Sequence, residues 1–155
     1  MLKRLLLGVL CCALLLVAGC SEQVDVSNII STNTTDTGII EIKEKYFIES
    51  CNDVYLNPDL YIGKLIKIEG MYEEFINESS GEKYMGVIRY GPGCCGNDGV
   101  AGFEFTWAGE TPEVNDWIEV VGSVAIINDE NQSYVVLDAN SLTVLDVRGL
   151  ETVAN

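Results

Sequence analysis

Apolar and polar residues alternate along most of the chain after Gly38, and this period of two constrains the fold more than any other feature. Successive side chains of a strand point to opposite faces of a sheet, so the alternation indicates strands with one buried face. The predicted strands cover Leu65–Ile76, Tyr84–Tyr90, Ala101–Trp107, Ile118–Ile126, Tyr134–Leu137 and Leu142–Val147, after a shorter apolar pair at Ile40 and Ile42. A short helix is expected at Glu49–Asn57, before Pro58. The sequence therefore predicts an all-β domain with one short helix.

Polar turns separate these strands at short intervals, and Gly70, Gly86 and Gly122 lie inside strand patterns. Glycine in a strand marks a bulge or a tight bend. Five or six curved strands in a domain of this size fit a small OB-like barrel, with a β-sandwich as the competing architecture. We expect the barrel over residues 39–147 and a C-terminal tail over residues 148–155. Trp107 and Trp117 both lie in strand patterns and are expected in the core.

The first nineteen residues have the layout of an export signal. Lys3 and Arg4 give a positive start, Leu5–Ala18 is an apolar or small run, and Gly19-Cys20 follows. The run is shorter than the roughly 20 apolar residues that a membrane-spanning helix needs, which disfavours a retained helix. The segment resembles the lipobox of bacterial lipoproteins, which implies that Cys20 carries acyl chains such as palmitate.

The residues that follow Cys20 are rich in serine, threonine, asparagine and aspartate up to Gly38. This composition predicts a flexible tether over residues 20–38, between the lipidated cysteine and the barrel. Two or more acyl chains hold a protein firmly on a membrane. The sequence therefore predicts a lipid-anchored protein on the extracytoplasmic face of the cell membrane.

Composition excludes several classes of function. The chain of 155 residues has a formal net charge of −15, and removal of a signal that contains Lys3 and Arg4 makes it more negative. Nucleic-acid binding needs basic patches, so we expect no nucleic-acid partner. The chain has no histidine, which removes the commonest general base and metal ligand. No motif places a pair of catalytic carboxylates either, and we expect a protein that is not an enzyme.

Cysteine chemistry centres on the segment from Gly91 to Gly99, where four glycines and a proline predict an irregular loop. Cys94 and Cys95 are adjacent there, with Asp98 close by and Cys51 in the predicted helix. These four residues form a candidate site for Zn or Cu, because thiolates favour soft metals. They also allow a disulfide in an oxidising compartment, or a buried structural role for the thiols. Arg89 and Tyr90 precede the loop and are candidate contacts on its surface.

Three stretches resemble one family. They are Asn57–Lys64, Cys94-Cys95-Gly96-Asn97-Asp98 and Asp116–Gly122, and their order and spacing are similar to the soluble C-terminal domain of the YcgQ-type permease-subunit family. The resemblance covers roughly residues 40–147 and implies an OB-like fold of unknown function. It also implies that Cys94, Cys95 and Asp98 are functional. Members of that family carry membrane-spanning helices, whereas this chain has a predicted lipid tether.

The leading hypothesis is a lipid-anchored, non-enzymatic OB-like binding module. Its candidate ligand is a metal ion, and its candidate partner is a membrane permease or another envelope protein. One alternative is a thiol/disulfide redox protein that attacks with Cys94 or Cys95 and resolves with Cys51. The other is a structural envelope protein with no small ligand.

Overall fold

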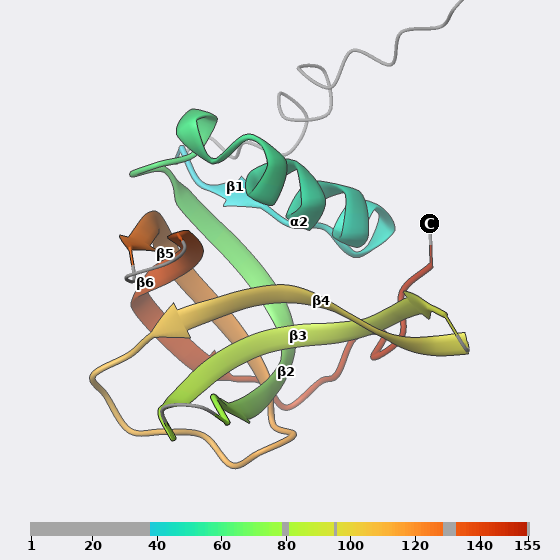
Figure 1. The fold of residues 1–155 in the computed structure, drawn as a ribbon. Coiled ribbons are helices and arrows are strands. Elements are labelled where there is room, and N and C mark those ends of the chain that lie inside the picture. The colour runs from blue at the N-terminus through green and yellow to red at the C-terminus, as the bar shows by residue number, and fades with distance from the viewer. Residues whose placement is uncertain (1–37, 79–80, 95, 129–132, 155) are drawn as a thin grey trace, which may run out of the picture.

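The computed structural model describes residues 38–78, 81–94, 96–128 and 133–154. These residues form a mostly-β fold, a closed five-stranded barrel with one extra strand and a single short α-helix (Figure 1). The small barrel with one helix predicted from the alternation is confirmed. Cys20 and the rest of the predicted signal and tether lie outside the described residues, except Gly38.

One short strand and three helices precede the five barrel strands in the described chain. The elements are β1 (Ile40–Glu41), the 3-10 helix η1 (Glu44–Tyr46), α2 (Phe47–Leu56), the 3-10 helix η2 (Pro58–Leu60), β2 (Leu65–Ile76), β3 (Lys83–Gly93), β4 (Gly96–Thr106), β5 (Trp117–Asn128) and β6 (Ser133–Val144). The predicted helix is present with slightly earlier bounds. The last two predicted strands form one continuous strand, β6.

Barrel closure depends on β2, which pairs with two strands in succession. Its first half, Leu65–Met71, pairs with β5, and its second half, Met71–Ile76, pairs with β3. The circuit then runs from β3 to β4, β6 and β5, with a parallel pairing between β4 and β6. The short strand β1 adds to β2 in parallel. A strand that pairs with one strand over its first half and with another over its second half bends where the partner changes.

Glycines stand where the backbone bends or approaches another strand. A Cβ on Gly70, just before β2 changes partner, would meet the carbonyl oxygen of Ile88 at 2.5 Å. The register between β5 and β6 shifts between Val121 and Gly122, as a bulge. The bulge or bend predicted at Gly70 and Gly122 is therefore present. Gly102 has a φ of +145°, and a side chain there would overlap the carbonyl of Val87.

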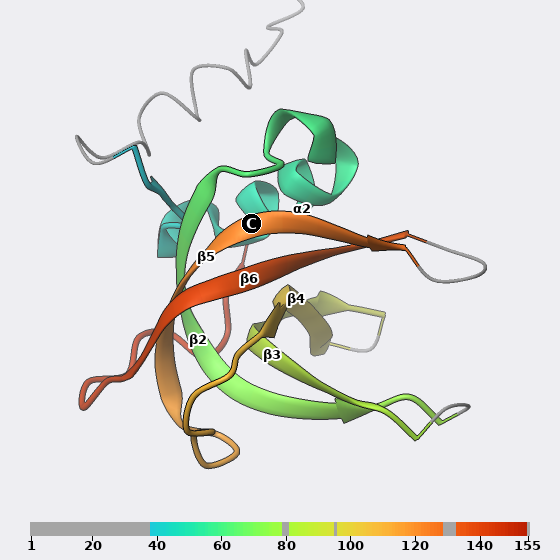
Figure 2. The same cartoon turned by 90° about the vertical axis from the view of Figure 1, so that its left-hand side faces the viewer.

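The core fills the barrel, and α2 lies across one end of it (Figure 2). Phe47, Cys51 and Val54 of α2 are buried against inward-facing strand residues such as Tyr72 and Phe103. Each apolar side chain of this size stabilises the fold by roughly 1.5–3 kcal/mol when fully buried. Trp117 is buried as predicted. Trp107 is half-buried after the end of β4 and packs against the edge of the core, so its expected core position is confirmed only in part.

The glycine-rich segment is a strand hairpin and not the irregular loop that its composition predicts. β3 continues to Gly93 and β4 begins at Gly96, with Gly91 opposite Gly99. A Cβ on Gly99 would meet the carbonyl oxygen of Pro92 at 2.6 Å. Glycine allows the two backbones to pair this closely, which local composition alone does not reveal.

The C-terminal segment after β6 returns across the barrel. Leu145 packs against a small outer cluster of Met71, Ile88 and Trp117. Further on, Tyr90 donates its N–H to Glu151 O, and Val153 donates to Tyr90 O, both at 2.8 Å. The side chain of Val153 is buried. Most of the segment expected as a tail is therefore part of the folded domain.

Arg89 connects this returning segment to the barrel. Its side chain is 3% exposed and lies between the rings of Phe47 and Trp117, 4.8 Å from each centroid. It donates to the carboxylate of Glu44 at 2.9 Å and to the carbonyls of Glu69 and Leu150 at 2.9 and 3.2 Å. One buried guanidinium thus links β3 to η1, α2, β2, β5 and the C-terminal segment.

We expect Glu44→Gln to lower the free energy of unfolding by about 1–2 kcal/mol, because a charge-assisted hydrogen bond is lost at a half-exposed carboxylate. Hydrogen bonds from the backbone N–H of Leu150 and from Arg89 lower the pKa of Glu44 in the folded chain. Its stabilisation is therefore complete above the unfolded-state pKa of about 4.3 and is lost as pH falls through the lower folded-state pKa. Urea unfolding at pH 7 and between about pH 5 and 3 measures this.

The matched control is Glu49→Gln, which removes the same charge from an exposed position on α2. Its unfolding free energy should stay within about 0.5 kcal/mol of the parent. If Glu44→Gln and Glu49→Gln unfold alike at pH 7, the described role of Glu44 is wrong.

Candidate ligand-binding groove

The predicted cysteine site is divided between two parts of the molecule. Cys94 lies exposed at the tip of the β3–β4 hairpin, with its Sγ 3.9 Å from Oδ2 of Asp98. The carboxyl group of Asp98 lies over Gly93, where a Cβ would overlap it. Cys95 follows in the chain but lies outside the described residues. The hairpin therefore places Cys94 and Asp98 close together.

Cys51 is a core residue of α2. Its side chain is 1% exposed, and burial raises the pKa of its thiol to about 12. A thiol that stays protonated is neither a good nucleophile nor a soft-metal ligand. Within the part of the chain that the structure describes, no three cysteine, aspartate or glutamate residues are placed to hold a metal ion. The metal and redox hypotheses for Cys94 and Cys95 stay predictions from sequence, without support from Cys51.

Of the two candidate loop contacts, Arg89 lacks the surface position expected of it, whereas a contact role for Tyr90 stays a prediction. The guanidinium of Arg89 is buried and pairs with Glu44. The Tyr90 side chain is partly exposed, while its backbone pairs with the returning C-terminal segment.

None of the helices in residues 38–78, 81–94, 96–128 and 133–154 has both the length and the apolar character needed to cross a membrane.

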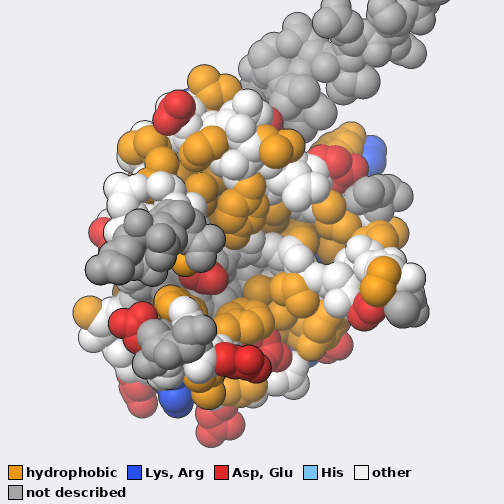
Figure 3. Space-filling model, viewed as in Figure 1, with side chains coloured by type: hydrophobic (Ala, Val, Ile, Leu, Met, Phe, Trp, Pro, Cys, Tyr) orange, Lys and Arg blue, Asp and Glu red, His pale blue; other side chains and the backbone are white. Residues whose placement is uncertain are grey.

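A groove that sequence reasoning missed runs along the outside of the barrel over β4. It consists of three adjoining cavities of about 500, 320 and 610 Å³, and Glu104 lines all three. Tyr55 is shared by the first two cavities and Tyr134 by the last two. We call this feature the Glu104 groove. Figure 3 shows that face of the molecule hollowed at its centre, with hydrophobic side chains gathered around the hollow.

Strand register explains why Glu104 faces outward. It lies between Gly86 of β3 and Val136 of β6, while its neighbours Phe103 and Phe105 point into the core. Partial burial raises the pKa of Glu104. No other described residue forms a hydrogen bond or an ion pair with its carboxylate. A half-buried carboxylate without a partner is poorly solvated, so a cation or hydrogen-bond donor placed there would be stabilised.

Aromatic rings form much of the groove wall. Tyr55 of α2 stacks on Phe103 with centroids 5.2 Å apart and donates its hydroxyl to Gly102 O at 2.9 Å. Trp107, after β4, donates its indole N–H to Glu110 O at 3.0 Å and lines the largest cavity. The other aromatic residues that line the three cavities are Phe75, Tyr84, Phe103, Phe105 and Tyr134. Such surfaces bind apolar or cationic groups.

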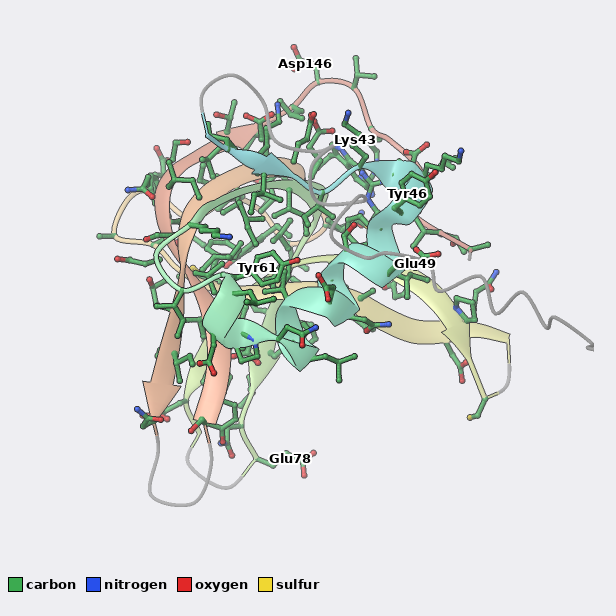
Figure 4. The ribbon with its side chains drawn as sticks, turned by 90° about the horizontal axis from the view of Figure 1, so that it is seen from above. Lys43, Tyr46, Glu49, Tyr61, Glu78 and Asp146 are labelled. Atoms are coloured by element: carbon green, nitrogen blue, oxygen red, sulfur yellow. The ribbon has the colours of Figure 1, made fainter. Side chains whose placement is uncertain are left out.

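The largest cavity of the groove reaches the ends of β2 and β5, because Asn77 and Asn128 line it. Seen from above, Glu78 at the β2–β3 turn lies on the opposite side of the molecule from Asp146 of the C-terminal segment (Figure 4). The sequence signal that could have indicated this site is the set of aromatic residues beside polar turns, namely Tyr84, Trp107 and Tyr134.

We expect Cys51 to resist thiol reagents in the folded protein. In a chain that begins at Ser21 and carries Cys94→Ser and Cys95→Ser, Cys51 should react at least about a hundredfold more slowly in buffer than in urea, because labelling requires opening of the core. Spectrophotometric titration with an aromatic disulfide measures the rate. Rapid labelling of the native chain would contradict the described burial.

Comparison with known proteins supports one assignment. The family model for the DUF1980 C-terminal domain matches residues 21–155, which is most of the chain. No curated protein matches the chain. The matched region contains the whole barrel, the Glu104 groove and the Cys94 hairpin. The chain therefore belongs to the DUF1980 C-terminal domain family, a family of uncharacterised function.

Proposed function

We propose that this chain is a lipid-anchored, extracytoplasmic binding module that holds its ligand in the Glu104 groove. The observation that carries the proposal is the groove itself, which is lined by aromatic rings and contains the half-buried carboxylate of Glu104, a group without a partner among the described residues. Concave sites lined by apolar and aromatic side chains with few polar groups are typical of ligand binding.

The order of the strands supports a binding module of the OB type. The circuit β2-β3-β4-β6-β5 is a five-stranded barrel, and β3 and β4 are the second and third of its strands in chain order. OB-type barrels bind ligands on the face of their second and third strands, between the loop after the first strand and the loop after the fourth. The corresponding strands here are β2 and β5, and Asn77 and Asn128 at their ends line the largest cavity of the groove.

A role without catalysis agrees with the residues that line the groove. Glu82 and Glu104 are the acidic residues there, and Lys83 is held by Glu74 at 3.1 Å. General acid–base chemistry commonly needs a second group that is paired with the first and oriented toward the reacting atoms. Glu104 has no such partner among the described residues, so the groove suits binding better than turnover.

Membrane anchorage rests on the lipobox-like sequence that ends at Cys20. The resemblance to a permease-subunit domain extends the proposal: the partner is a membrane transport protein or another envelope protein. A tether of the predicted composition would let the domain reach such a partner from the same membrane surface.

Anchorage predicts incorporation of labelled palmitate into the wild-type chain in growing bacterial cells. Cys20→Ala should abolish both the label and recovery in the membrane fraction, because a single signal cysteine carries the acyl chains. Cys94→Ser is the control and should keep both. A wild-type chain without label would refute lipid anchorage.

Ligand binding predicts occupancy of the groove in cells. A photo-crosslinking benzophenone residue in place of Tyr134 should form a covalent adduct, identified by mass spectrometry, that is at least about fivefold more abundant than at Val147. Val147 is 80% exposed in the C-terminal segment, away from the groove. Trp107→Ala should reduce the adduct by removing an aromatic wall. Equal, low adduct formation at both positions would refute a binding role for the groove.

A further inference from the structure

We propose that the occupant of the Glu104 groove is an extended polypeptide segment with a lysine or arginine side chain that pairs with Glu104. This inference rests on the proposed function and names the class of ligand. It is argued from the charge of the groove, its aromatic walls and the exposed backbone edge of β4.

The charge of the groove calls for a cation from outside. Glu104 lines all three cavities and makes no hydrogen bond or ion pair with another described residue. Lys83 also lines the largest cavity, but its ammonium group already contacts Glu74 at 3.1 Å. A partly desolvated carboxylate gains most from a cation that arrives with matching hydrogen bonds. The groove is thus complementary to a positive group.

The aromatic walls suit the stem of a basic side chain. Phe75 shares one cavity with Glu104, and Tyr55 and Tyr134 share two each. Lysine and arginine place apolar methylene groups along such surfaces and keep the charged end at a carboxylate. Rings within about 6 Å of the cation would add a cation–π contribution.

Strand β4 offers a backbone edge beside this carboxylate. In the described chain, β6 pairs with β4 only over Glu104–Thr106, so Val100 and Gly102 lie beyond that pairing, with the carbonyl oxygen of Gly102 accepting from the hydroxyl of Tyr55. Tyr90, opposite Val100 in the ladder, directs its N–H and C=O to the C-terminal segment. In such an antiparallel pair, the backbone N–H and C=O groups of both residues face away from the partner strand. The N–H and C=O of Val100 therefore point away from β3.

An extended chain is the natural partner for such an edge. The cavity between β4 and α2 is lined by every residue from Gly99 to Glu104, and Val100 is 54% exposed. Exposed edge groups form hydrogen bonds with added strands, and side-chain pockets then provide specificity. A free amine would use the carboxylate alone. A polypeptide would use the carboxylate, the rings and the backbone of Val100 together.

The test begins with random twelve-residue peptides displayed on phage. They are selected on the full-length chain, expressed in bacterial cells and purified in detergent. We expect enriched sequences that place lysine or arginine between apolar residues. Synthetic copies of the enriched peptides should bind, by fluorescence anisotropy, at least about tenfold more weakly to Glu104→Gln, and should lose affinity as salt rises.

Glu113→Gln is the matched control, since it removes the same charge from an exposed residue outside the groove. Its affinity should stay within about twofold of the parent. Thermal unfolding confirms that both variants fold. Enriched peptides that lack basic residues, or that bind Glu104→Gln as tightly as the parent, would overturn the inference.

Two further arms separate a polypeptide from a free amine. N-methylation of single peptide bonds should weaken binding at alternate positions near the basic residue, because every second N–H of a strand faces its neighbour. Cadaverine and lysine amide should bind at least about a hundredfold more weakly than the peptide. Tolerance of N-methylation throughout, or equal binding of the small amines, would overturn the polypeptide assignment.

Failure of this inference is distinguishable from failure of the proposed function. If the benzophenone at Tyr134 captures a ligand in cells but no basic peptide is enriched, the groove is a binding site for another class of molecule. If neither experiment gives binding, both the inference and the proposed function fail.

Discussion

The buried cation Arg89 holds the segments that precede and follow the barrel, at Glu44 and Leu150, onto it. It is almost fully shielded from solvent and depends on Glu44 and on carbonyl groups of β2 and the C-terminal segment for every hydrogen bond that the structure describes. Removal of one partner from a buried charged group is strongly destabilising, since the charge remains in a poorly polarisable environment. The segments before and after the barrel are therefore parts of one cooperative unit, with Arg89 at their meeting point.

Most of the strands could be predicted because they depend on local alternation, which a sequence displays directly. The bends at Gly70 and Gly122 were also predictable, since glycine inside a strand commonly marks a bulge or a tight bend. The burial of Arg89 was not, because its partner Glu44 lies 45 positions away and no short-range pattern connects them. The hairpin after Gly91 was missed because a high glycine content is typical of an irregular loop. Pairing between β3 and β4 overrides that local preference.

The candidate site was less predictable than the fold. The sequence grouped Cys94 and Asp98, which lie close together, with Cys51, which is buried in the core. Glu104 looks in the sequence like any polar residue on the solvent side of a strand. Its environment comes from Tyr55, before β2, and from Tyr134, in β6. Aromatic residues beside polar turns mark some of the lining, but only the closed barrel brings these residues around Glu104, so their spacing in the sequence does not indicate a shared site.

The groove follows from the way in which the barrel closes. β4 and β6 must meet in parallel to complete the circuit, and within the described chain they pair only over Glu104–Thr106 before β4 continues with β3 as a hairpin. The helix α2 lies beside the rest of this edge, and the hydroxyl of Tyr55 donates to the carbonyl oxygen of Gly102. Side chains of a helix cannot satisfy a strand edge as regularly as another strand does. The same short pairing that closes the barrel therefore leaves an incompletely filled edge beside Glu104, and a ligand can bind there without opening the core.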